Sequence, residues 1–162
     1  MDENLEVRIA TPDDLDQIMN LALLMQQEIG IADANPHKIL SEIYPSLHLD
    51  GGLVGVIGPK DRIEGGILLR FGTLFYSDEK VLEEKGLFIH PDCRSAKGGR
   101  ARKLCEFAKQ TSDSLGLPLL IGVLNDVRTK GKLRLYERQF GEPIGAFFLY
   151  NGRSGPELTR GD

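Results

Sequence analysis

A cluster of basic side chains surrounds two adjacent glycines in the stretch HPDCRSAKGGRARKLCEF, residues 90–107. The glycines are Gly98 and Gly99, and the basic residues around them are Arg94, Lys97, Arg100, Arg102 and Lys103. An apolar run precedes this stretch and a helical pattern follows it, so the sequence predicts a strand, a glycine-containing loop and a helix. The first turn of a helix has unpaired N–H groups and a positive dipole end, and a phosphate or pyrophosphate satisfies both.

The residue types around the two glycines suit an anionic ligand. Glycines allow a ligand to approach the backbone closely, and arginine and lysine neutralise its charge. The stretch contains neither the Walker A pattern nor G-x-G-x-x-G, so no nucleotide-binding fingerprint identifies the anion. A solvated glycine-rich turn followed by a basic helix face is an equally good interpretation of these residues alone.

The composition is typical of a soluble globular protein. The 162 residues are 41% hydrophobic and 27% charged, with a formal net charge of −4. The positive charge is local and the net charge is negative, so we expect no nucleic-acid partner. The longest apolar run, residues 117–124, is too short to span a membrane, and the acidic N-terminus lacks the pattern of a signal peptide. We therefore expect no membrane partner and a cytoplasmic location.

The two cysteines, Cys93 and Cys105, do not form a C-x-x-C motif, and no pair of histidines completes a metal-binding set. We expect no metal site and two reduced thiols. The neighbouring cations could lower the pKa of the Cys93 thiol, which leaves a nucleophilic cysteine as the alternative.

Alternating and helical patterns place the basic stretch within a single α/β domain over residues 1–152, followed by a polar, flexible tail over 153–162. Strands are expected at 6–10, 53–57, 62–75, 81–90, 117–124 and 143–150. The segment 117–124 is almost entirely apolar, which is typical of a strand buried on both faces. Helices are expected at 12–29, 36–44, 99–115 and 127–139, with Pro45 ending the second one.

This order of elements resembles that of the Gcn5-related N-acetyltransferases (GNAT family) from about Glu6 to Tyr150. Three stretches carry the resemblance at the level of residues: FIHPDCR (88–94), GRARKLCEFAK (99–109) and LRLYERQFG (133–141). The resemblance implies an α/β fold with a central mixed, mostly antiparallel sheet of about six or seven strands, flanked by about four helices.

The same resemblance implies acetyl-CoA as the co-substrate, with its pantetheine between strands 81–90 and 117–124. The residues that match the family's binding positions are Phe88, Ile89, Arg94, Lys97, Gly98, Gly99, Arg100, Ala101 and Asn125. If the family's glycine-containing step begins at Gly99, the loop before it has about two extra residues. That insertion is the main departure from the family pattern.

The resemblance also implies direct transfer of an acetyl group to an amine, with Tyr136 as the general acid that protonates the leaving thiolate. A carboxylate is needed to accept the proton of the amine, and the predicted strand 81–90 offers Glu83 and Glu84. Adjacent strand residues face opposite sides of a sheet, so only one of the two can point toward the site. Simple alternation places Glu83 on the face of Leu87 and Ile89.

The acceptor site in the family is formed by the first two helices and the last strands, here residues 26–48 and the segment after Phe140. The acidic residues Glu28, Asp33 and Glu42 could attract a cationic amine there. We therefore expect an N-acetyltransferase, monomeric or homodimeric, that acts on a primary amine of an unidentified small molecule or protein. The alternatives are a non-catalytic CoA-binding module on the same fold and, disfavoured by the net charge, a nucleic-acid-associated protein.

Overall fold

Five strands form one sheet in the computed structural model, which describes residues 5–94, 98–123 and 129–152. The strands are β1 (Val7–Ile9), β2 (Gly52–Ile57), β3 (Gly65–Gly72), β4 (Val81–Ile89) and β5 (Leu119–Leu120). They lie side by side in the order β1-β2-β3-β4-β5; the first three pairings are antiparallel, and β5 runs parallel to β4. The mixed, mostly antiparallel sheet is confirmed, but in the described residues it has fewer strands than the six or seven expected.

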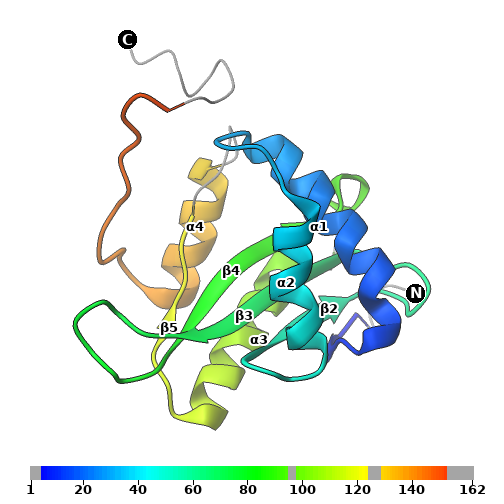
Figure 1. Ribbon diagram of the computed structural model, residues 1–162, viewed down its shortest axis with the longest axis horizontal. Coiled ribbons are helices and arrows are strands. Elements are labelled where there is room, and N and C mark those ends of the chain that lie inside the picture. Colours follow the sequence, from blue (N-terminus) through cyan, green and yellow to red (C-terminus); the bar gives the residue numbers. More distant parts are fainter. Residues whose placement is uncertain (1–4, 95–97, 124–128, 153–162) are drawn as a thin grey trace.

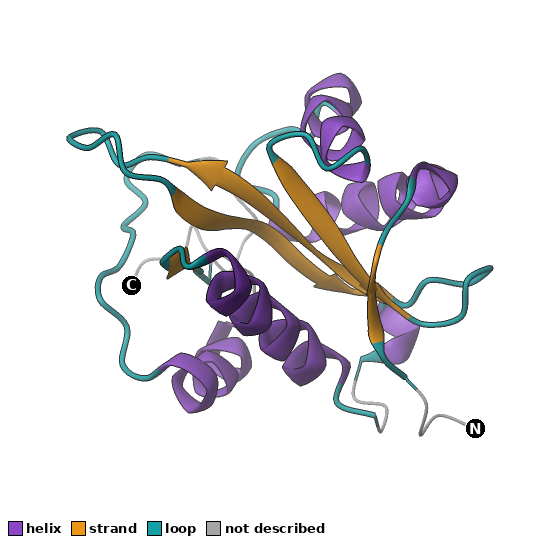
Figure 2. Ribbon diagram, turned by 90° about the horizontal axis from the view of Figure 1, so that it is seen from below, coloured by secondary structure: helices purple, strands orange, loops and turns teal. Residues whose placement is uncertain are grey.

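Helices cover both faces of this sheet (Figures 1 and 2). They are α1 (Leu15–Ile29), α2 (Pro36–Leu47), α3 (Arg100–Leu115) and α4 (Thr129–Phe140). Helices α1 and α2 pack on one face, and α3 and α4 pack on the other. The expected number of helices is confirmed. None of the helices in the described ranges is long and apolar enough to cross a membrane.

Two apolar clusters, one on each face of the sheet, hold these layers together. On the α1–α2 face, Ile18 and Met25 pack against Val54 and Phe88, as the apolar stripe of the first helix predicts. On the α3–α4 face, the buried residues are Ile57, Ile67, Leu69, Leu82, Leu87, Leu104, Cys105, Ala108 and Tyr136. Each buried aliphatic side chain contributes about 1.5–3 kcal/mol.

The Phe107 side chain of α3 packs directly over a glycine of β2. A Cβ atom built on Gly55 would lie 2.5 Å from Cε2 of Phe107. A side chain at this position would therefore meet the Phe107 ring of α3, which would have to move. The close contact fixes the helix that follows the basic loop.

The start of the first helix is fixed by a carboxylate, as its sequence predicts. The Asp14 carboxylate accepts a hydrogen bond from the Thr11 backbone N–H at 2.9 Å and two from the Arg8 guanidinium at 2.8 and 2.9 Å. These bonds lower the pKa of Asp14 to about 2, the Arg8 contact being the largest cause. The capping acid is thus ionised throughout the neutral range.

Three of the expected elements differ from the structure. Helix α2 does not end before Pro45 but continues to Leu47, because a proline in the last turn removes only one hydrogen bond. The strand expected at 117–124 is reduced to Leu119–Leu120, and Leu120 is 39% exposed rather than buried on both faces. The described residues 143–150 form no strand, since they pair with no other strand of the described chain.

Candidate active site

Strand β4 has a second neighbour only near its beginning. It pairs with β3 over Val81–Ile89, but β5 pairs only at Leu82 and Glu83. The His90 N–H donates to the Glu64 carbonyl in the loop before β3, so the alternate residues Leu87 and Ile89 turn their backbone groups toward the β5 side. The strand edge beyond Glu83 therefore has no strand partner among the described residues.

Two cationic side chains donate hydrogen bonds to backbone carbonyl oxygens along this edge. The Lys132 ammonium of α4 donates to the Leu87 carbonyl oxygen at 3.2 Å, and the Arg94 Nε donates to the Ile89 carbonyl oxygen at 3.1 Å. The resemblance places the amide groups of pantetheine against the backbone around Phe88 and Ile89, which includes the second of these carbonyls. A ligand that pairs with both carbonyls would have to displace the two side chains.

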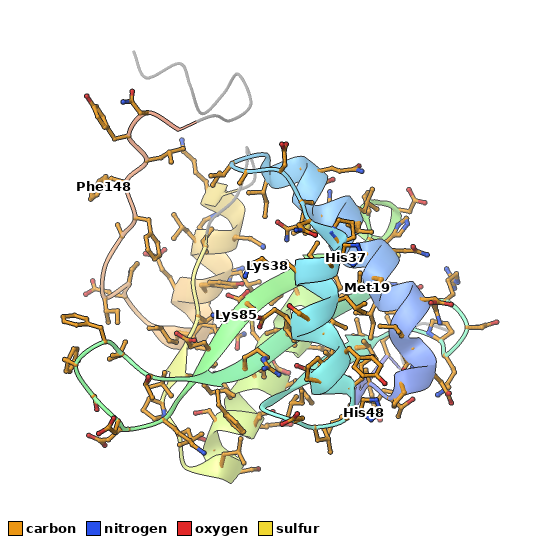
Figure 3. All side chains as sticks on the ribbon, in the orientation of Figure 1. Met19, His37, Lys38, His48, Lys85 and Phe148 are labelled. Atoms are coloured by element: carbon orange, nitrogen blue, oxygen red, sulfur yellow. The ribbon has the colours of Figure 1, made fainter. Side chains whose placement is uncertain are left out.

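A β-bulge at Lys85 decides which glutamate of β4 faces which helices. Leu68 of β3 pairs with Gly86, but the next residue, Leu69, pairs with Glu84, so Lys85 is the extra residue. Lys85 lies on β4 in Figure 3. The extra residue reverses the alternation of side chains along the strand. Glu84 therefore shares a face with Leu87 and Ile89, and the expectation that Glu83 does so is wrong.

The partners of the two glutamates across β3 and β4 confirm this assignment. Glu83 pairs with Arg70, whose guanidinium contacts Ser46 and Glu42 of α2, so Glu83 lies on the α1–α2 face. It also forms an ion pair with Lys85 at 3.3 Å. Glu84 pairs with Leu69, which belongs to the apolar cluster beneath α3 and α4.

The Glu84 carboxylate is held in a desolvated position beside β5. Its Oε1 accepts a hydrogen bond from the Gly122 N–H at 3.2 Å. Burial raises the pKa of Glu84, while the Gly122 hydrogen bond and the charges of Lys132 and Lys85 oppose that rise. A carboxylate with a raised pKa is a better proton acceptor than an exposed one.

Tyr136 of α4 is buried on the same face as Glu84. Its side chain is 7% exposed and packs edge to face against Phe140, with ring centroids 5.8 Å apart. Burial raises the pKa of Tyr136 well above its usual value, and the nearby charge of Glu84 raises it further. The phenol is thus a protonated donor at neutral pH.

The Tyr136 hydroxyl has no hydrogen-bond partner in the part of the chain that the structure describes. An unsatisfied buried hydroxyl costs about 1–3 kcal/mol, and most native structures satisfy such groups. The Tyr136 hydroxyl is therefore a buried donor that a ligand or a water molecule can satisfy.

Neither cysteine has the properties of a nucleophile. Burial, followed by the charge of Glu84, raises the pKa of Cys105 to about 12. Burial, followed by the charge of Glu64, also raises the pKa of Cys93, so the cations around it do not activate it. No cluster of three or more potential metal ligands occurs in the described ranges of the chain.

At the other end of β4, carboxylates of the chain bind two of the basic residues of the loop. The Arg94 guanidinium donates to both oxygens of Glu28 in α1, at 3.0 and 2.6 Å. Arg100 Nε lies 2.9 Å from Glu64 Oε1, with 8% and 6% of the two side chains exposed. Both arginines were expected to bind the pyrophosphate of CoA, and in this structure both form internal ion pairs.

The remaining loop positions form the start of α3. Gly98 and Gly99 both have positive φ angles, 126° and 61°, which favour glycine. Gly99 caps the helix without a side chain, and Ala101 packs against the apolar cluster on the α3–α4 face. The expected binding residues Lys97 and Asn125 lie outside the described residues.

The structure thus brings Tyr136, Glu84 and Lys132 to one face near the divergence of β4 and β5, and places Glu83 on the other face. Phe88 packs on the α1–α2 face and Ile89 on the opposite one. The sequence analysis did not identify Lys132, although it lies one helical turn before Tyr136. Of the expected acceptor-site acids, Glu28 pairs with Arg94 and Glu42 lies 3.4 Å from Arg70 Nε, whereas Asp33 is exposed.

Comparisons with known proteins find similar solved structures. No family model and no curated protein matches the chain. The solved structure of the aminoglycoside acetyltransferase AAC(6')-Iy with a bisubstrate analogue containing CoA superposes with a TM-score of 0.69 and 14% identity, covering 93% of this chain and 99% of that one. A Trypanosoma brucei acetyltransferase superposes with a TM-score of 0.64 and 18% identity, covering 91% and 99% of the two chains.

An aminoglycoside acetyltransferase from an uncultured soil metagenomic sample gives a TM-score of 0.65 at 16% identity, with 90% of this chain and 95% of that chain covered. These similarities extend over nearly the whole length of each protein. The chain therefore has the fold of the GNAT-type acetyltransferases, and the expected fold class is confirmed.

Proposed function

We propose that this protein is an acetyl-CoA-dependent N-acetyltransferase that acts on a primary amine. The observation that carries the proposal is the buried Tyr136 hydroxyl, which has no hydrogen-bond partner among the described residues and lies on the same face as Glu84 in a chain with the acetyltransferase fold. Acetyl-CoA supplies the activated acetyl group as a thioester. Solved relatives of this fold are complexes with CoA or with a CoA-containing analogue, which supports CoA as the ligand here.

In the proposed reaction, the amine nitrogen attacks the thioester carbonyl carbon, a C–N bond forms and the C–S bond breaks. Amines with a pKa near 10 are mostly protonated at neutral pH, so a group must first accept a proton from the ammonium. Glu84 takes this role in our proposal because its pKa is raised and it lies on the face of Tyr136.

The departing thiolate receives a proton in the same proposal. Tyr136 donates it, because its hydroxyl is protonated and has no partner among the described residues. The second proton, which the nitrogen loses as the amide forms, restores the phenol of Tyr136, and the proton on Glu84 passes to solvent. Lys132, whose ammonium lies on the neighbouring β4 edge, positions Glu84 through its charge. The backbone of Gly98–Ala101 at the start of α3 binds the pyrophosphate, with Arg102, which pairs with Glu106 on the exposed side of the helix, contributing charge.

A non-catalytic CoA-binding module is the second candidate, and one observation favours it. Arg94 and Arg100 are bound to Glu28 and Glu64, so two cations expected at the pyrophosphate are already neutralised. This arrangement lowers the expected affinity for CoA without changing the fold.

Thermal unfolding with acetyl-CoA and with CoA tests whether the fold binds this ligand. Binding to the native state raises the unfolding temperature in a concentration-dependent manner. We expect both molecules to stabilise the protein, and the absence of any shift at millimolar concentration overturns both candidates. Release of free thiol from acetyl-CoA across a panel of primary amines then separates them, because only the enzyme releases thiol in an amine-dependent way.

A further inference from the structure

The amine of Lys132 lies inside the candidate active site. The Lys132 side chain of α4 is half-buried, and its Nζ donates to the Leu87 carbonyl oxygen at 3.2 Å. That carbonyl belongs to the part of the β4 edge that has no strand partner among the described residues. A ligand that pairs with this edge would displace the Lys132 amine from the carbonyl but leave it close by, because the side chain is attached to α4.

Helix α4 brings the same amine close to Tyr136. Residues four positions apart lie on one face of a helix, with Cβ atoms about 5–6 Å apart. In the proposed reaction the Tyr136 hydroxyl protonates the departing sulfur, so the thioester lies within hydrogen-bond distance of that hydroxyl. The flexible four-carbon stem of lysine spans about one helical turn. The Lys132 Nζ can therefore reach the carbonyl carbon of the thioester.

A proton acceptor for this amine is in place. Glu84 lies on the same face as Tyr136, and the charge of Lys132 lowers the pKa of the Glu84 carboxyl against the effect of burial. The carboxylate proposed to deprotonate an external amine is thus one whose charge already interacts with the Lys132 ammonium. An attached amine also needs no binding step, which is equivalent to a very high local concentration.

Two neighbouring lysines differ from Lys132 in their surroundings. Lys85 of β4 (Figure 3) forms an ion pair with Glu83, which lies on the α1–α2 face, at 3.3 Å. Lys130 of α4 is exposed, and it lies two residues before Lys132, which turns it by about 200° around the helix. Lys130 is therefore a matched control, on the same helix, for acetylation that the site does not catalyse.

We propose that this chain acetylates its own Lys132, an inference that rests on the proposed function. With acetyl-CoA bound, the Lys132 Nζ attacks the thioester carbonyl carbon, a C–N bond forms and the C–S bond breaks. Glu84 accepts the first proton of the ammonium and passes it to solvent. Tyr136 protonates the thiolate, and the second proton that the nitrogen loses restores the phenol. The products are a neutral amide at Lys132 and the free thiol of CoA.

Acetylation of Lys132 changes the site in which it occurs. The amide has no charge, so the cation that faces Glu84 is lost. The added acetyl group also lies next to the open β4 edge, in the space proposed for pantetheine. We therefore expect the modified protein to acetylate other amines more slowly. Acetylation of Lys132 would then inhibit the protein when acetyl-CoA is present without an acceptor amine.

Peptide mass spectrometry after incubation of the full chain with saturating acetyl-CoA tests the proposal. We expect an acetyl group to be added to Lys132 at least about tenfold faster than to Lys130. The rate per chain should not change when the protein is diluted about tenfold, because the reaction occurs within one chain. Glu84→Gln should lower the rate at Lys132 to about that at Lys130 and leave the rate at Lys130 unchanged.

Thermal unfolding of the same sample with acetyl-CoA separates this inference from the proposed function. If acetyl-CoA raises the unfolding temperature but Lys132 reacts no faster than Lys130, self-acetylation is wrong and the proposed function is unaffected. If acetyl-CoA gives no shift, both are wrong. A rate per chain that falls on dilution, or a Glu84→Gln variant that reacts at the wild-type rate, also contradicts catalysed acetylation within one chain.

Discussion

The polar groups at the two ends of β4 differ in whether the protein itself supplies their partners. Near the divergence from β5, the Tyr136 hydroxyl is buried and unpartnered within the described chain, and Glu84 is desolvated. At the other end, Arg94 and Arg100 are bound by Glu28 and Glu64. The first end leaves a donor available for a ligand, whereas the second satisfies its cations internally. The chemistry is therefore expected at the first end, and binding at the second depends more on backbone N–H groups than on arginine.

The largest expected effect comes from breaking the buried ion pair at the loop end. Glu64→Ala leaves the Arg100 charge buried without its carboxylate, which costs about 3–5 kcal/mol of stability. Glu106→Ala removes the partner of Arg102 in an exposed pair of similar length, 2.9 Å, and should cost less than about 1 kcal/mol. Urea unfolding of both variants measures the difference. Equal losses in the free energy of unfolding would mean that the buried Arg100–Glu64 pair stabilises the fold no more than the exposed Arg102–Glu106 pair does.

The next effect concerns the end of β4 near α4 and separates its two glutamates. Glu84→Gln removes the proposed base and should lower kcat/KM by about 10²-fold. Glu83→Gln, one residue away on the opposite face, should change it less than about twofold. Steady-state thiol release measures both. A large loss in the Glu83 variant with none in the Glu84 variant would reverse the assignment that the bulge makes.

The same Glu84→Gln variant should be more stable than the wild type at neutral pH. The raised pKa of Glu84 means that its carboxyl ionises more readily in the unfolded chain, where its pKa has the ordinary value of 4.5. Its contribution to stability is therefore present below that value and is lost as the pH rises through the folded-state pKa. Thermal unfolding between pH 4 and 8 should show a gain at pH 7 that disappears at pH 4. A variant less stable than the wild type at pH 7 would show that the carboxylate is structural.

The smallest expected effect concerns the ion pair between Glu28 and Arg94, at the end of β4 next to the basic loop. Glu28→Gln weakens the hold on Arg94 and should increase the affinity for CoA by about two- to fivefold, the value of a partly exposed ion pair. Calorimetric titration at two salt concentrations measures it, with a steeper salt dependence expected in the variant. Unchanged affinity would indicate that Arg94 does not reach the ligand.

Local patterns predicted most of the fold. The four helices and the strands expected at 6–10, 53–57, 62–75 and 81–90 depend on residues near one another in the chain, and α1–α4 and β1–β4 confirm that these elements exist. The bulge at Lys85 depends on the register between two strands, and Gly86, a glycine inside a strand, was its only local sign. The prediction of a strand at 143–150 was wrong because the residue types there favour a strand but do not specify a strand with which it pairs.

The site was predicted in part for the same reason. Tyr136 and the glutamates of β4 were found by motif and position, whereas the pairing of Arg94 with Glu28 joins residues 66 positions apart. The sequence of the loop gives the number of its cations but not which carboxylates reach them. The carboxylates that neutralise Arg94 and Arg100 come from α1 and from the segment between β2 and β3, which only the three-dimensional fold brings beside the loop.

Tyr136→Phe tests the central claim most directly, because it removes only the hydroxyl. The ring remains to pack against Phe140, so folding and CoA affinity should change less than about twofold. With saturating acetyl-CoA and an amine that the wild-type protein acetylates, we predict a fall in turnover of about 10²-fold or more. Turnover equal to that of the wild type would contradict the assignment of Tyr136 as the proton donor.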